Sequence, residues 1–199
     1  SCGIRDLGTM GGVAYFVVSD SGGTSLWRTD GTVPGTAEIE AFDCASGCEM
    51  RTFGVSEARL YFLKGSPGVS PALWVTDGFA AGTFEVLAPG PIDPSGVTGA
   101  GSVALPGNRL VFAAHDVESG FEPWISDGTP SGTHVIVNLS TASDPSQPKR
   151  FSANGDRVLF SAQESVHGPE PWVSGGSAGN TAMVADIRPG LLGSDPLPF

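Results

Sequence analysis

The sequence predicts an all-β protein, a β-propeller built from four similar sheets, and three observations lead to this fold class. A twelve-residue motif, EPWISDGTPSGT from Glu122 to Thr133, has three relatives elsewhere in the chain. Each copy holds one tryptophan, and successive tryptophans lie 47, 50 and 48 residues apart. The segments between the motifs are short and rich in β-branched and aromatic residues, without useful helical periodicity. Four short antiparallel strands per repeat match one propeller blade.

The second copy gives the order of strands within one repeat. We expect two strands within residues 53–64, joined by a tight turn near Glu57, a third strand at 72–77 and a fourth at 83–88. The other copies follow the same plan. Their second strands are expected at 13–18, 109–114 and 157–162, and their fourth strands at 37–42, 133–139 and 181–187.

The phase of the repeats divides the chain into four stretches of about 48 residues. We expect one propeller domain over residues 1–199, with repeats at approximately 7–52, 53–102, 103–150 and 151–199. Two arrangements fit this count. The four repeats close into a four-bladed propeller, or they belong to a longer array or to an eight-bladed ring made by two copies. We predict four blades in one chain, with the residues before Leu7 pairing with the chain end to help closure.

Composition and charge exclude some partners. The 199 residues carry 21 acidic and 10 basic side chains, a formal net charge of −11. Nucleic acid is not an expected partner, because phosphate binding needs a basic patch. No run of about 18 apolar residues exists, so no membrane span is expected. An acidic surface suits an exported protein.

The three cysteines bear on the cellular compartment. Cys44 and Cys48 form a C-x3-C pair in a glycine-containing loop. Zinc would need two more ligands at similar spacing, and the three histidines do not supply them. A Cys44–Cys48 disulfide in an oxidising compartment is the better interpretation. Cys2 then bridges to one of these cysteines, pairs with another chain or stays free.

Each part of the motif has a structural interpretation. A large aromatic side chain at one point of every repeat most simply fills the gap between neighbouring blades. A sugar-binding platform would instead need the rings exposed. The following Asp-Gly pair begins a self-contained turn, in which Asp accepts backbone N–H groups and Gly takes a positive φ. The packing residues are Trp27, Trp74, Trp124 and Trp172. The acceptors of the turn are Asp30, Asp77 and Asp127, and its glycines are Gly31, Gly78 and Gly128.

The fourth copy departs from the motif at the aspartate position, and the aspartates of the other copies raise the possibility of a metal site. Gly175 stands where the other copies have Asp, so this loop is held differently or belongs to the variable blade. One Asp per loop supplies too few oxygen ligands for Ca²⁺. We therefore expect no metal and no cofactor, with calcium in the loops or a central channel as the remaining alternative.

Acidic residues before two of the tryptophans are the only candidates for a ligand site. Paired carboxylates are the chemistry of glycoside hydrolysis, but nothing in the sequence enforces their separation. Solvated hairpin loops explain the same residues more simply. No nucleophile elbow, phosphate loop or zinc-protease motif is present, so no catalytic residue is assigned and no enzyme is expected. The weak candidates are Asp116, Glu118, Glu122, Glu164 and Glu170.

The repeat resembles that of the bacterial ELWxxDGT-repeat proteins. The third copy carries LVFAA and SGFEPWISDGTPSGTHVI, and the fourth carries RVLFSA, HGPEPW and VADIRPG. The first two copies depart from the pattern, with Ser25 and Ala72 in place of Glu and Phe79 in place of Thr. The resemblance implies exported or surface proteins of bacteria such as myxobacteria, with a propeller-like fold. It implies no established activity.

These observations favour a non-enzymatic propeller module that binds or scaffolds a protein or glycan outside the cytoplasm, secreted, periplasmic or at the cell surface. Two alternatives remain. One is an accessory subunit of a larger extracellular or membrane-attached assembly. The other is a glycan-acting hydrolase or lyase that uses carboxylates at a propeller face.

Overall fold

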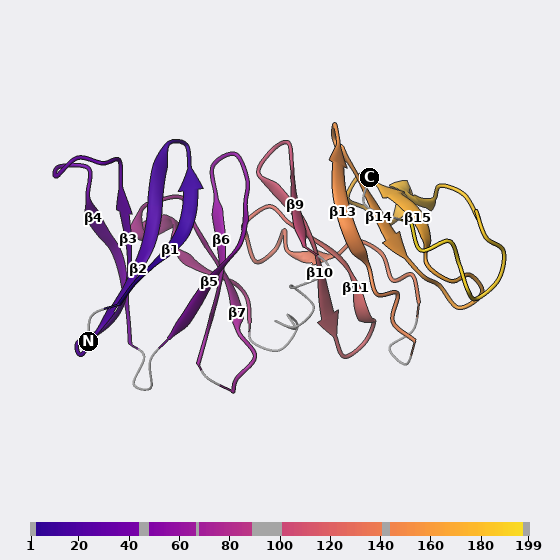
Figure 1. Cartoon of the computed structure of the whole chain (residues 1–199), viewed down its shortest axis with the longest axis horizontal. Coiled ribbons are helices and arrows are strands. Elements are labelled where there is room, and N and C mark those ends of the chain that lie inside the picture. Colours follow the sequence, from indigo (N-terminus) through magenta and orange to yellow (C-terminus); the bar gives the residue numbers. More distant parts are fainter. Residues whose placement is uncertain (1–2, 44–47, 67, 89–100, 141–143, 197–199) are drawn as a thin grey trace. The chain divides into compact units, whose positions relative to one another are not determined.

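The computed structural model describes residues 3–43, 48–66, 68–88, 101–140 and 144–196 (Figure 1). In these ranges the regular structure is strand, apart from the single-turn 3-10 helices η1 (Ala80–Gly82) and η2 (Ala178–Asn180). The strands form four separate sheets of four antiparallel strands, each in sequence order. This confirms the predicted all-β class, and we call the sheets blades 1 to 4.

The strands of the first two blades follow the predicted plan. Blade 1 consists of β1 (Gly3–Met10), β2 (Val13–Asp20), β3 (Gly23–Thr29) and β4 (Ala37–Phe42). Blade 2 consists of β5 (Glu49–Val55), β6 (Leu60–Gly65), β7 (Ala72–Thr76) and β8 (Phe84–Leu87).

The last two blades repeat the plan with shorter fourth strands. Blade 3 consists of β9 (Ser102–Leu105), β10 (Arg109–Asp116), β11 (Gly120–Ser126) and β12 (His134–Val135). Blade 4 consists of β13 (Lys149–Asn154), β14 (Arg157–Ala162), β15 (Glu170–Ser174) and β16 (Thr181–Met183).

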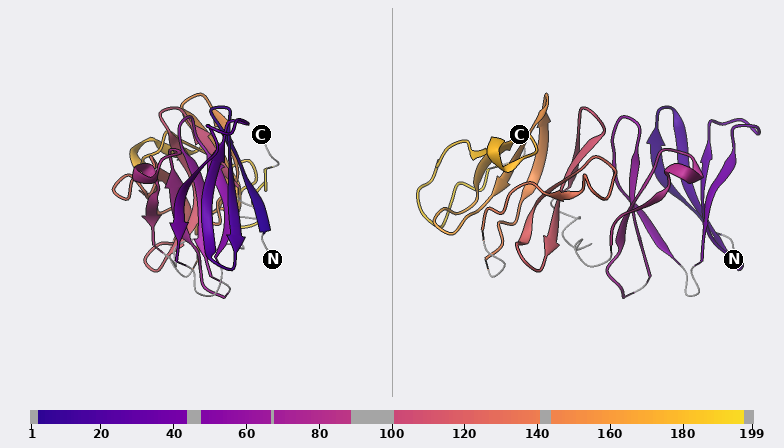
Figure 2. Two further views of the ribbon diagram at one scale, coloured as in Figure 1. Left: turned by 90° about the vertical axis from the view of Figure 1, so that its left-hand side faces the viewer. Right: turned by 180° about the vertical axis from the view of Figure 1, so that it is seen from behind.

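The chain divides into two compact units. Ser1–Pro89 contains blades 1 and 2, and Gly90–Phe199 contains blades 3 and 4. Within each blade neighbouring strands are hydrogen-bonded in the order of the sequence, and their colours can be followed in the right-hand view of Figure 2. Closure of all four blades into one ring stays a prediction. No helix in the described part of the chain is long and apolar enough to cross a membrane.

Each unit has its core between its two blades. Strand alternation turns one set of apolar side chains of each sheet toward the neighbouring sheet. In the first unit Tyr15 and Leu26 of blade 1 share a buried cluster with Leu60 and Phe62 of blade 2. The second unit has the corresponding arrangement, in which the cluster contains Leu105, Val111, Ile125 and Ile136 of blade 3 and Val158, Phe160, Ala162 and Trp172 of blade 4.

The predicted fourth strands of blades 3 and 4 are too long. The expected ranges 133–139 and 181–187 shrink to β12 and β16. After β12 the chain keeps one bond to the third strand, from the Ile136 N–H to the Pro123 oxygen (2.8 Å). The following residues then bond to the side chain of Glu122 instead of to backbone. The third strand therefore stops pairing where its glutamate begins.

The residues before Leu7 belong to the first strand of blade 1. Gly3 pairs with Ser19, Ile4 with Val18 and Asp6 with Phe16, all on β2. The predicted pairing of this segment with the chain end stays a prediction, because residues 197–199 lie outside the described residues. The pairing with β2 extends the first repeat to Gly3, across a register shift between Asp6 and Gly8 that is typical of a β-bulge.

Candidate functional site

The loop after the third strand is held by the same hydroxyl network in all four blades. The hydroxyl residue that ends the third strand contacts the last threonine of the motif, with O···O distances of 2.6 Å in blade 1 and 2.7 Å in the others. The same hydroxyl accepts the N–H of the motif glycine. The pairs are Thr29–Thr36, Thr76–Thr83, Ser126–Thr133 and Ser174–Thr181.

The motif aspartates bond to their own loops. Asp127 Oδ1 accepts the N–H of Thr129 (2.8 Å) and the Thr129 hydroxyl (2.7 Å). Asp30 accepts the same two groups of Thr32, and these bonds hold the pKa of Asp30 below its ordinary value. Such local bonds are typical of Asx turns. These carboxylates are therefore engaged without any ligand.

The second glycine of the motif makes room for the aspartate. Gly132 lies against the carboxylate of Asp127 so closely that a Cβ at this position would overlap it. Gly35 and Asp30 have the same relation, as do Gly82 and Asp77. The spacing of five residues between Asp and Gly thus reflects one close contact inside each loop.

Blade 4 makes this contact from the opposite side. Gly175 replaces the aspartate, and Asn180 stands five residues later where the other blades have the second glycine. The Asn180 Oδ1 accepts the N–H of Ser177 at 2.9 Å, the position that corresponds to Thr129. A Cβ on Gly175 would lie 2.6 Å from Asn180 Nδ2. In blade 4 the acceptor side chain therefore comes from the second position and the glycine from the first. This exchange explains how the fourth loop is held.

Glu122 and Glu170 are the most buried of the predicted acidic candidates. Both side chains have no exposed surface. Glu122 accepts the N–H groups of Leu139 (3.1 Å) and Ser140 (3.3 Å) and the hydroxyl of Ser146 (2.6 Å). At the same offsets in sequence, Glu170 accepts the N–H groups of Ile187 and Arg188 and the hydroxyl of Ser194. Each carboxylate organises the loop that follows its blade's fourth strand.

The two glutamates differ in their acidity. Burial raises the pKa of Glu122, although the bonds from Ser146, Leu139 and Ser140 act against it. At Glu170 burial also acts to raise the pKa, but the hydrogen bonds to its carboxylate outweigh that effect and leave the pKa below its ordinary value. The same set of bonds therefore stabilises a carboxylate in two different environments.

The other acidic candidates lie at the hairpins between second and third strands. Asp116 Oδ1 accepts the N–H groups of Glu118 (2.9 Å) and Ser119 (2.6 Å), and Glu118 itself is exposed. In blade 4, Glu164 contacts His167 Nδ1 at 2.5 Å, and His167 Nε2 lies 3.6 Å from Asp186. Each of these contacts stays within one blade. None joins a candidate carboxylate of blade 3 to one of blade 4.

The tryptophans lie at the sides of the blades. Trp74 packs against the cluster of the first unit, with its ring 5.3 Å from Phe42 of blade 1 in an edge-to-face arrangement. Trp172 belongs to the buried cluster between blades 3 and 4, and Trp124 is also buried. Trp27 and Trp74 are both half-buried, and Trp27 stacks on Phe16.

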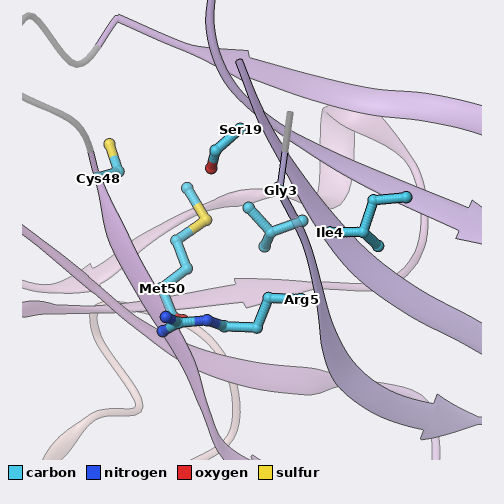
Figure 3. A pocket seen from close by; sticks show the side chains of 7 residues that line it. Gly3, Ile4, Arg5, Ser19, Cys48 and Met50 are labelled. Atoms are coloured by element: carbon cyan, nitrogen blue, oxygen red, sulfur yellow. The ribbon is translucent and has the colours of Figure 1, made fainter. Parts of the chain in front are cut away.

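A cavity of about 210 Å³ opens beside the first strand (Figure 3). Ile4, Arg5, Cys48 and Met50 contribute to its lining, and Arg5 donates to the Met50 carbonyl oxygen at 3.2 Å. Its polar groups thus bond to the protein itself. Among the described residues, no group of three or more His, Cys, Asp and Glu side chains is placed to hold a metal ion.

The predicted Cys44–Cys48 disulfide stays a prediction, because Cys44 lies outside the described residues. Cys48 is itself disulfide-bonded. Cys2 also lies outside the described residues, but the next residue, Gly3, lines the same cavity as Cys48. The other two cysteines of the sequence, Cys2 and Cys44, are the candidates for the partner of Cys48.

Three hairpins between second and third strands expose a valine. Val69 in blade 2, Val117 in blade 3 and Val166 in blade 4 are 60%, 88% and 62% exposed. They lie between β6 and β7, β10 and β11, and β14 and β15. Sequence reasoning missed them because the loops differ in length and composition. Their common feature is the hairpin, not a motif.

Comparison with known proteins identifies the fold. No family model matches the chain, and no curated protein matches it. Three solved structures are similar: an acylaminoacyl peptidase of Pyrococcus horikoshii (TM-score 0.52, 10% identity), a puromycin hydrolase (0.51, 14%) and a prolyl endopeptidase (0.50, 9%). The matches cover 92%, 94% and 92% of this chain but only 27%, 28% and 26% of those chains. The similarity lies in propeller domains and concerns the fold alone.

Proposed function

We propose that this chain is a non-enzymatic β-propeller module that binds a protein partner outside the cytoplasm of a bacterium. The observation that supports this function most directly is the recurrence of an exposed valine on the second-to-third-strand hairpin of three blades. A single exposed apolar residue needs no explanation, but a pattern repeated at one place of the fold favours an interaction surface.

The motif residues support a binding function indirectly, because their side chains already have partners within the protein. The aspartates bond to their loops, the glutamates bond to backbone N–H groups, and three of the four tryptophans lie against apolar clusters or are buried. What the blades share therefore maintains the fold. The exposed residues outside the motif, including the recurring hairpin valines, are left to determine recognition.

The chemistry of the hairpins favours protein over glycan. Val117 lies between Asp116 and Glu118, so its hairpin presents an apolar tip with flanking acids. Protein surfaces with apolar contacts and basic residues match this combination, whereas a sugar is usually bound by exposed aromatic rings. Export is supported by the resemblance to surface proteins and by the disulfide of Cys48, which an oxidising compartment favours.

The test is affinity capture from the cell envelope fraction of the producing bacterium. The purified chain is compared with the double variant Val117→Glu/Val166→Glu and with Val33→Glu as a matched control. Val33 is 90% exposed but lies in a motif loop. We expect one protein to be enriched by the wild type and the control and lost with the double variant.

Equal capture by all three chains would contradict the proposed surface. The hydrolase alternative is examined in the same preparation with polysaccharide and ester substrates. Turnover that disappears in Glu122→Gln or Glu170→Gln variants, while the fold is retained, would overturn the non-enzymatic assignment.

A further inference from the structure

In blade 4 the segment after β16 packs on the hairpin between β14 and β15, and we call this segment, residues 184–194, the strap. The Gly168 N–H of the hairpin donates to the Gly190 oxygen of the strap at 3.1 Å. Gly168 also lies so close to Gly193 that a Cβ at this position would overlap the strap backbone. The first half of the strap bonds to the carboxylate of Glu170 through two N–H groups. The strap is therefore held mainly by its backbone.

One side chain, that of His167, adds a charged link between the hairpin and the strap. Its Nδ1 lies 2.5 Å from Oε1 of Glu164 on the same hairpin, and its Nε2 lies 3.6 Å from Oδ2 of Asp186 on the strap. In the described part of the chain these two carboxylates are the acidic groups within 4.0 Å of the ring nitrogens. The other charged residues at this contact are Glu170, whose carboxylate bonds to the strap, and Arg188, whose N–H is one of its donors.

The proton on Nε2 of His167 determines whether the side-chain link to the strap exists. A neutral imidazole carries one N–H group, and the shorter contact assigns it to Nδ1, which faces Glu164. Nε2 then presents a lone pair to the negatively charged oxygen of Asp186. The imidazolium ion carries a proton on both nitrogens and attracts both carboxylates. Protonation therefore adds an attraction between the hairpin and the strap.

Blade 3 has the strap contact without this charged link. When the two blades are aligned on their buried glutamates, Ser119 and Asn138 of blade 3 stand at the positions of His167 and Asp186. Neither of these side chains ionises in the accessible pH range. Blade 3 nevertheless keeps the two backbone bonds to its buried glutamate. The fold thus does not require the histidine, which leaves another role for it in blade 4.

We propose that His167 is a pH-sensitive clasp, which fastens the strap to the hairpin of blade 4 when its ring is protonated and releases it when the ring loses that proton. Histidine changes charge between about pH 5 and pH 8, where ordinary carboxylates stay ionised. The strap is therefore held more firmly at mildly acidic pH than at neutral pH. Ile187 and Arg188 come directly after Asp186, so their bonds to Glu170 loosen first. This inference does not rest on the proposed function.

Amide hydrogen exchange at Ile187 and Arg188 tests the clasp. Protection, corrected for the intrinsic pH dependence of exchange, is measured at about pH 5.5 and about pH 7.5. In the wild type it should be about two- to fivefold greater at the lower pH, as expected for a partly exposed ion pair. His167→Ser and Asp186→Asn, which introduce the residues of blade 3, should each remove this difference.

His134→Ser is the matched control, because His134 is exposed on β12 and forms no ion pair with any described residue. It should retain the wild-type difference. Comparison between the chains cancels the pH response of other groups, including the buried glutamates. Circular dichroism checks folding, and Asp186→Asn, which preserves side-chain shape, decides the result if His167→Ser unfolds. An equal pH response in the wild type and in both clasp variants would overturn the proposal, as would equal wild-type protection at the two pH values.

Discussion

The motif loops of blade 3 and blade 4 solve one local problem with exchanged residues. In blade 3, Asp127 supplies the acceptor and Gly132 supplies the space, whereas in blade 4 Asn180 supplies the acceptor and Gly175 the space. The N–H group two residues after the first position is bonded in both. The loop thus requires one side-chain acceptor and one glycine. The acceptor can stand at the first position with the glycine five residues later, or the two can be reversed.

The largest loss of stability is expected when the space that Gly132 leaves for the Asp127 carboxylate in blade 3 is filled. Gly132→Ala places a Cβ where the Asp127 carboxylate lies, so the aspartate must leave its bonds to Thr129. We expect a loss of about 2 kcal/mol in the free energy of unfolding, as for overpacked sites. Urea denaturation measures it.

Gly179→Ala in blade 4 is the control for that change. No atom lies within 4 Å of a Cβ at Gly179, so the free energy of unfolding should stay within about 0.5 kcal/mol of the wild type. A similar loss in both variants would show that the glycine, rather than the contact with the carboxylate, matters for stability.

A double-mutant cycle in blade 4 tests the exchange itself. Gly175→Asp puts a carboxylate against Asn180 and should cost about 1–2 kcal/mol. Adding Asn180→Gly recreates the blade 3 arrangement and should recover most of the loss, giving a coupling of about 1 kcal/mol between neighbouring sites. Additive effects of the two changes would disprove that the positions exchange roles.

The buried glutamates are expected to have a smaller effect, on the pH dependence of stability, with opposite signs in blades 3 and 4. The raised pKa of Glu122 means that its contribution to stability is greatest at acid pH and declines as pH rises through its folded-state pKa. The lowered pKa of Glu170 gives a contribution that is present above its ordinary value of 4.5 and is lost as pH falls through the folded-state pKa.

The matched variants Glu122→Gln and Glu170→Gln separate these contributions. From about pH 3 to pH 7, the destabilisation by Glu170→Gln should grow and that by Glu122→Gln should shrink. Thermal unfolding at several pH values measures both. Parallel pH profiles for the two variants would contradict the assigned difference in environment.

The smallest effect is expected at the acceptor of blade 4. Asn180→Asp keeps an oxygen that can accept the Ser177 N–H, so stability should change by about 0.5 kcal/mol or less. A loss as large as that of Gly132→Ala would show that the Asn180 amide nitrogen is needed as well.

The blades could be predicted because their evidence is periodic along the sequence. One tryptophan and one Asp-Gly turn at a constant phase predicted the strand order, which the sheets confirm. For blade 4 the sequence indicated that the Gly175 loop is held differently or belongs to a variable blade, but it did not identify Asn180 as the substitute acceptor. Reading Gly175 together with Asn180, five residues later, would have revealed the substitute acceptor.

The role of the glutamates was also missed, for a different reason. Their partners lie 17, 18 and 24 residues later and are mostly backbone N–H groups, which leave no side-chain pattern. Only the serine 24 residues after each glutamate, Ser146 and Ser194, repeats in sequence. The fourth strands of blades 3 and 4 were predicted too long, because strand propensity does not show where a side chain replaces the backbone as hydrogen-bond partner.

The close contact between the motif's first residue and the residue five positions later has a consequence for how such arrays diverge. A repeat that gains a second acceptor is crowded, and a repeat with two glycines lacks a partner for its N–H group. Either single step passes through a less stable intermediate. In other copies of this repeat the two positions should therefore change together, which makes their covariation a guide for aligning blades whose tryptophan or strand pattern has been lost.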